Sequence, residues 1–282
     1  MVFDHPLDGA RGKIVRATQH AVALRQHCQR YTSGRPAVLS VEQSEQGQAV
    51  DIVLESTENP PPYLGAILGD IAHNLRSALD QLTWQLALIG PRAAELEQPK
   101  VSRRIQFPIS DSRAQFDGLV VGFLDEDSQG RIGRWQPFNN LEAGTHLVNP
   151  LAILRAISNT DKHRLLVPAV GKIALDDIRI RSTVPLDLNQ VEAFVDDGAH
   201  VGEGTVLFRI PCPDPPGVSE AYLVSQPVPD FLIDGIGMLR LDQVFDLAEQ
   251  ISIVVEDIGQ RFPTPEEFDL RTEGWLTPDL TL

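Results

Sequence analysis

Hydrophobic residues recur every three or four positions in four segments of the chain, and this spacing predicts four helices. The clearest segment runs from 63 to 89 and is closed by Gly90 and Pro91, residues that end helices. The segment 151–166 follows Pro150, which the first turn of a helix tolerates. The other two segments are 11–32 and 238–261.

Shorter runs of β-branched residues alternate with polar ones and predict strands. The runs 37–41 and 49–54 flank a polar turn, which favours a hairpin. The segment 92–149 is rich in Pro, Gly and charge, so loops are expected there, with one short strand at 105–109. Antiparallel sheet is also expected from short runs at 173–175, 178–180, 191–195, 205–210 and 222–224.

Helices and strands are segregated along the chain, whereas a parallel sheet would need strict β-α-β alternation. The predicted fold class is therefore α+β, with about four helices packed as a bundle and inserted antiparallel β-sheet segments. The helices that must pack together lie on both sides of the β segment, which favours a single composite domain over residues 1–262. An acidic C-terminal tail, 263–282, is expected to follow it.

Charge limits the function classes. The net charge of −15 repels nucleic-acid phosphates and acidic membranes, so RNA binding would need a local basic face. The segment 11–30, with five Lys or Arg and no acidic residue, offers one. Two cysteines, Cys28 and Cys212, suit neither a zinc cluster nor a disulfide framework. Without a signal segment or an apolar run of about 20 residues, the chain is expected to be cytoplasmic and not membrane-bound.

The helix expected at 63–89 carries a polar row opposite its apolar face. His73, Ser77, Asp80 and Trp84 fall together on that side, and the four-residue spacing of Arg76 and Asp80 allows an ion pair worth about 0.2 to 0.5 kcal/mol. A solvated face with self-paired charges is one interpretation. Trp84 favours another, in which a second element covers this side of the helix.

A second polar stretch, ISNTDKHR, spans residues 157–164. If the helix expected at 151–166 runs through it unbroken, Asp161 falls inside the apolar stripe and its carboxylate needs a partner. The partners within reach would be Arg76 or His73, or the adjacent Lys162 and His163. Alternatively the helix breaks here, and a residue between 159 and 161 caps a new helix start.

If the two stretches meet, they form one polar cluster between helices. The histidines would be acids or bases and Arg76 an anion binder, so His73, Arg76 and His163 are the candidate catalytic residues, although any catalysis stays open. A small polar or anionic ligand is the expected partner, and a structural ion network is the other interpretation. No metal or cofactor is predicted, because no complete ligand motif or nucleotide loop occurs. The predicted ligand-binding set is His73, Asn74, Arg76, Asp80, Asp161, Lys162 and His163.

The same stretches carry a resemblance. GDIAHNLRSALDQLTW (69–84) and ISNTDKHR (157–164), with RIQFPI and WQPF between them, resemble a family of bacterial proteins to which no chemistry is assigned. More distantly, the first stretch is similar to the Arg-and-His motif of HEPN domains. That similarity implies a helical, homodimeric, metal-independent ribonuclease or toxin–antitoxin component, with Arg76 in the motif. The motif histidine would stand at position 81, where this chain has Gln81, so His73 or His163 would have to replace it.

Overall fold

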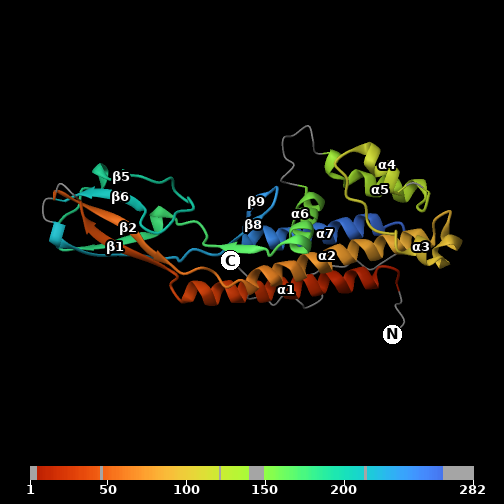
Figure 1. The fold of residues 1–282 in the computed structure, drawn as a ribbon, viewed down its shortest axis with the longest axis horizontal. Helices are drawn as coiled ribbons and strands as arrows, with labels where there is room; N and C mark the ends of the chain where they lie inside the picture. Colours follow the sequence, from red (N-terminus) through yellow and green to blue (C-terminus); the bar gives the residue numbers. More distant parts are fainter. Residues whose placement is uncertain (1–4, 45–46, 121, 140–148, 213–214, 263–282) are drawn as a thin grey trace. The chain divides into compact units, whose positions relative to one another are not determined.

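The structure, a computed structural model, describes residues 5–44, 47–120, 122–139, 149–212 and 215–262 (Figure 1). The chain divides into two compact units. One contains 1–24, 65–166 and 233–282, and the other contains 25–64 and 167–232. The single composite domain predicted for 1–262 stays a prediction, and the predicted acidic tail lies outside the described residues.

The four predicted helices are confirmed. Their apolar stripes are fully buried, as at Leu75 of α2 and Ile251 of α7. Asn149 caps the start of α6, where its side chain accepts hydrogen bonds from two backbone amides. These helices are α1 (Asp8–Ser33), α2 (Tyr63–Leu88), α6 (Pro150–His163) and α7 (Leu241–Gly259).

The segment expected to be loops also contains helices, so the prediction of about four is wrong. The described residues contain seven α-helices, and the three additional ones are short: α3 (Pro99–Ser102), α4 (Arg113–Val120) and α5 (Glu126–Arg134). Helices of four to nine residues are too short to produce a clear apolar period. They are fixed by capping and by packing on longer helices, as α5 packs on α7.

The strand predicted at 105–109 is also wrong, because this extended segment lies in no sheet. Its backbone is held by side chains instead. The Phe107 amide donates to Asp80, and the Phe107 carbonyl accepts from Arg76. On the other side, Gln136 donates to the Pro108 carbonyl and accepts from the Ser110 amide. An extended backbone satisfied in this way has the residue pattern of a strand without being one.

The second unit holds antiparallel strands, as predicted. The hairpin is confirmed as β1 (Ala37–Gln43) and β2 (Ala49–Thr57), in a sheet ordered β1-β2-β6-β5. The run 173–175 is not a strand, because Ile173 forms only an isolated bridge with Ala199. The remaining pairs are β4 (Ile178–Ser182) with β7 (Val218–Leu223), β5 (Glu192–Ala193) with β6 (Val206–Pro211), and β3 (Val167–Ala169) with β8 (Asp230–Ile233). Strand β9 (Gly237–Leu239) belongs to the first unit.

Both cysteines are free and buried, and both belong to this second unit. Burial raises the pKa of the Cys28 thiol to about 12, so Cys28 is protonated at neutral pH. A buried, protonated thiol is a poor nucleophile and metal ligand. Cys28 is therefore a packing residue.

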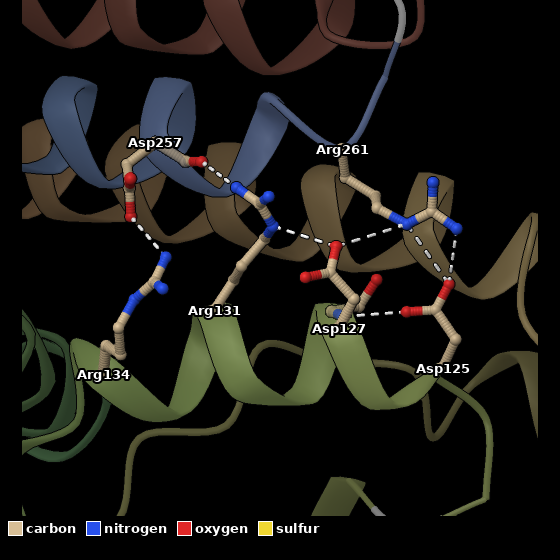
Figure 2. Close-up of polar contacts among 7 residues, drawn as sticks. Asp125, Asp127, Arg131, Arg134, Asp257 and Arg261 are labelled. Carbon is tan, nitrogen blue, oxygen red and sulfur yellow. Dashed lines mark hydrogen bonds and ion pairs between the residues drawn. The ribbon is translucent and has the colours of Figure 1, made fainter.

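A network of charged side chains fastens α5 to the end of α7 (Figure 2). Arg131 donates to the Asp257 backbone carbonyl at 3.3 Å, and Arg134 lies 3.7 Å from the Asp257 carboxylate. Arg261, just after α7, donates to Asp125 at 2.9 Å. The cations in this network face carboxylates or a carbonyl, so the network is self-compensated and needs no ligand.

Within this network, replacing Asp125 should lower the free energy of unfolding most. Burial alone would raise the pKa of Asp125, but hydrogen bonds from Ser128 and Arg261 outweigh it and lower that pKa. We expect Asp125→Ala to lower the free energy of unfolding by about 1 to 2 kcal/mol at neutral pH, because α5 loses its N-cap. A depressed pKa stabilises the fold above the unfolded value of about 3.9, and this contribution is lost as pH falls through the folded pKa.

Urea unfolding of both proteins from neutral to acid pH measures this. The difference between wild type and Asp125→Ala should shrink below about pH 4. Asp117→Ala is the control, because it removes only the exposed pair with Arg113 on α4 and should change stability by less than about 0.5 kcal/mol. A difference that stays constant with pH would contradict the assignment.

Candidate functional site

Arg76 and Asp80 of α2 hold the backbone of Phe107 from both sides. The Asp80 carboxylate accepts from the Phe107 amide at 2.8 Å, and the Arg76 guanidinium donates to the Phe107 carbonyl oxygen at 2.6 Å. The two side chains lie 3.5 Å apart, which confirms the predicted ion pair. This part of the polar row is therefore neither a free wet face nor a free ligand site, because it anchors residues 105–110 to α2.

The environment of Asp80 favours its neutral form. Burial raises the pKa of Asp80, and the nearby Arg76, the Phe107 amide, Lys162 and His73 offset this only in part. The carboxyl therefore gains a proton at a higher pH than an exposed aspartate would. Lys162 of α6 and His73 of α2 are among the groups whose positive charge lowers the pKa of Asp80, so both polar stretches lie within electrostatic reach of this carboxyl.

Two glycines let the end of α6 come close to α2. A Cβ atom on Gly65 would lie 1.9 Å from the Leu166 carbonyl oxygen, and one on Gly69 would lie 2.4 Å from the Asp161 carboxylate. Residues four apart lie on the same helix face. The segment that contains Asp161 and Lys162 therefore rests directly on this glycine face of α2.

The expected burial of Asp161 is wrong. Helix α6 continues unbroken to His163, which excludes the capped break at 158–161, but Asp161 is exposed and not inside the core. The buried stripe ends with Ile157 and Thr160, because the last turn of α6 meets glycine and not apolar side chains. Among the described residues Asp161 forms neither the predicted ion pair with Arg76 nor one with a histidine, and water solvates its charge.

The two hydrogen bonds that Asp80 and Arg76 form with the Phe107 backbone are named the Phe107 anchor. Next to this anchor, the structure forms a cleft of about 270 Å³ lined by four cations, which we name the cationic cleft. Arg76 comes from α2 and Arg104 from the segment after α3, whereas Arg155 and Lys162 come from α6. The lining contains no Asp or Glu. Its uncharged members are Gln106, Phe107, Pro108, Ile109, Ser158 and Asn159.

The four cations differ in how they are held. Arg76 is fixed by Phe107 and Asp80, and Arg155 donates to Asp111 at 2.7 Å and to the Ile109 carbonyl at 3.4 Å. Arg104 and Lys162 are exposed, and neither side chain forms a hydrogen bond or ion pair with another described residue. Asp80 and Asp111 each pair with one of the four cations, so the cleft keeps an excess of positive charge.

Sequence reasoning missed two of these four residues. Arg155 lies seven residues before Lys162, which places both on one face of α6 after two turns, so the helical spacing contained that signal. The sequence did not indicate Arg104, because it lies in a short turn whose position in the fold follows from no hydrophobic pattern. Its position depends on the anchor at Phe107, three residues later.

The seven predicted site residues do not form one compact cluster. Arg76 and Lys162 line the cationic cleft, whereas His163 lines a neighbouring pocket along α6 and not the cleft itself. Asn74 and Asp80 line a groove between α1 and α2, where Asn74 donates to the Asp70 carbonyl of its own helix. His73 and Asp161 are exposed and line none of these three spaces.

Trp84 lines this same groove, and Gly9 and Gly12 of α1 also line it. A second element does therefore lie beside the polar side of α2, as the aromatic residue indicated. Gln81, at the position where the HEPN motif would have histidine, also lines this groove and not the cationic cleft.

Comparison of the chain with known protein families, with curated proteins and with solved structures finds no match. The resemblance to the bacterial family and to HEPN domains therefore stays a prediction. Within the part of the chain that the structure describes, no helix combines the length and apolar character needed to cross a bilayer. The same described residues contain no group of three or more His, Cys, Asp or Glu arranged to hold a metal ion.

Proposed function

We propose that this protein binds a small anion in the cationic cleft. The observation that supports this is the lining, in which Arg76, Arg104, Arg155 and Lys162 converge without a carboxylate among them. The whole chain has 39 acidic and 24 basic residues, so a lining with four basic residues and no acidic one differs from the average composition. Like charges gathered in a small space repel one another, and a bound anion removes that cost.

The fixed and free cations would divide the work. Arg76 and Arg155 are held by backbone carbonyls and carboxylates, so their guanidinium groups are already oriented before a ligand arrives. Guanidinium groups suit the oxygens of phosphate and carboxylate, which accept paired hydrogen bonds. The exposed Arg104 and Lys162 would close on the anion from the solvent side.

The ribonuclease function implied by the HEPN similarity has weaker support. The cationic cleft does supply the basic surface around Arg76 that such an activity needs. However, His73 and His163, the two residues that would have to act as base, do not line the cleft. A cleft with cations and no general base suits binding better than hydrolysis.

Phosphate titration by calorimetry at low salt tests the proposal. We expect Lys162→Ala and Arg104→Ala each to weaken phosphate binding by about tenfold, because each removes one cation that would contact the bound phosphate. Lys100→Ala and Arg103→Ala are the matched controls. They remove the same charges from exposed positions outside the cleft, so they should change the affinity by less than about twofold.

Equal effects of cleft and control variants would show that phosphate responds only to overall charge, and the proposal would fall. A single-stranded RNA assayed in parallel separates the alternative. Cleavage by wild type that Lys162→Ala abolishes would replace the binding function by the ribonuclease.

A further inference from the structure

A second space adjoins the cationic cleft across one ridge of α6. This α6 pocket, of about 560 Å³, lies between α6, Asp111, Pro137 and the turn at 234–236. Arg155 and Asn159 line both the pocket and the cleft. They lie four residues apart on α6, one turn along the same face, so the two spaces meet along this pair of side chains.

The two spaces differ in charge. The charges that line the α6 pocket are paired with each other, since Arg155 donates to Asp111 at 2.7 Å and Arg164 lies 2.9 Å from Asp234. Much of the remaining lining is aliphatic, from Pro137, Ala152, Ile153, Ala156 and Ile236. The cationic cleft, in contrast, has four cations and no lining carboxylate.

From this contrast we infer that the ligand is an organic anion whose charged group binds in the cationic cleft and whose uncharged, largely apolar body lies in the α6 pocket. The inference rests on the proposed function and adds the ligand class to it. A cleft of about 270 Å³ has room for a phosphate or carboxylate group, and the neighbouring pocket of about 560 Å³ has the size of ordinary small-molecule sites. Arg155 would contact the ligand where its charged group joins its body.

Phenyl phosphate and inorganic phosphate are suitable probes, since both carry about two negative charges at about pH 8. Calorimetric titration of wild type should show phenyl phosphate binding about tenfold more tightly than phosphate, because the ring buries apolar surface in the α6 pocket. Ala156→Phe fills that pocket from a residue that does not line the cleft. It should reduce the preference to about one and leave phosphate affinity unchanged.

Ala114→Phe on the exposed side of α4 is the matched control and should keep the wild-type preference. Unchanged phosphate affinity also shows that Ala156→Phe is folded. The inference is overturned if wild type binds both probes equally, if Ala156→Phe keeps the preference, or if it loses phosphate as well. Phosphate binding that ignores Lys162→Ala would instead overturn the proposed function, so the two failures are read from different titrations.

Discussion

Gly65→Ala should lower the free energy of unfolding by about 2 to 3 kcal/mol, although alanine is the better helix former. The added Cβ would lie 1.9 Å from the Leu166 carbonyl oxygen and 2.9 Å from its carbonyl carbon. Backbone atoms cannot rotate away as a side chain does, so the segment after α6 must shift as a whole. Leu166 is fully buried, and that shift would disturb its packing too. Urea unfolding of wild type and Gly65→Ala, fitted with one common m-value, measures the loss of free energy of unfolding.

Gly69→Ala is the matched control for this prediction. It lies one turn further along the same face, and its Cβ would also come too close to an atom, the Asp161 carboxylate at 2.4 Å. Asp161 is exposed and has no described partner, so its side chain can turn into solvent at little cost. We expect Gly69→Ala to stay within about 1 kcal/mol of wild type.

Gly12→Ala supplies the baseline, because nothing lies within 4 Å of its added Cβ on α1. It should stabilise the protein by about 0.5 to 1 kcal/mol through helix propensity alone. Similar stability of Gly65→Ala and Gly69→Ala would mean that the end of α6 does not rest on α2 through its backbone. The placement of Lys162 beside Arg76 would then lose its structural basis.

The long elements could be predicted from the sequence because their patterns repeat. In α2 a leucine or isoleucine recurs along the whole helix, and in the hairpin two β-branched runs flank a polar turn. One residue that departs from such a repeated pattern does not change the predicted element. Helix α5 offers no such repetition. It has nine residues and a local cap at Asp125, and it is held by contacts with Arg261, which lies in a distant part of the chain.

The candidate site divides in the same way. Arg76 and Lys162, which belong to the predicted set, both line the cationic cleft, and each lies in a dense polar stretch of a helix. The error at Asp161 came from extending an apolar stripe one turn too far, without the information that glycine stands opposite. Gly65 and Gly69, four residues apart in α2, were the available signal for that close approach.

Asp80 holds the Phe107 amide and lies 3.5 Å from Arg76, which lines the cationic cleft. Asp80→Asn keeps an oxygen acceptor for the Phe107 amide, so its stability should stay within about 1 kcal/mol of wild type. Asp80→Ala leaves that amide without its acceptor and should cost about 1 to 3 kcal/mol. This pair of variants separates the hydrogen bond from the charge.

Removal of the Asp80 charge should strengthen anion binding, whereas removal of its hydrogen bond weakens the fold. Because Asp80 offsets the positive charge of Arg76, Asp80→Asn should tighten sulfate binding at neutral pH by roughly threefold or more. Sulfate is the probe here because it does not change its own charge over the range. In wild type, the raised pKa of Asp80 means that its negative charge is lost before that of an ordinary aspartate as pH falls.

Wild-type sulfate binding should therefore tighten as pH falls through the raised pKa of Asp80, whereas Asp80→Asn should lack this part of the pH dependence. The folded state binds this proton more tightly than the unfolded chain, so the same titration should stabilise the fold toward acid pH and not weaken it. Equal pH profiles, or weaker sulfate binding by Asp80→Asn, would place the anion somewhere other than beside Arg76.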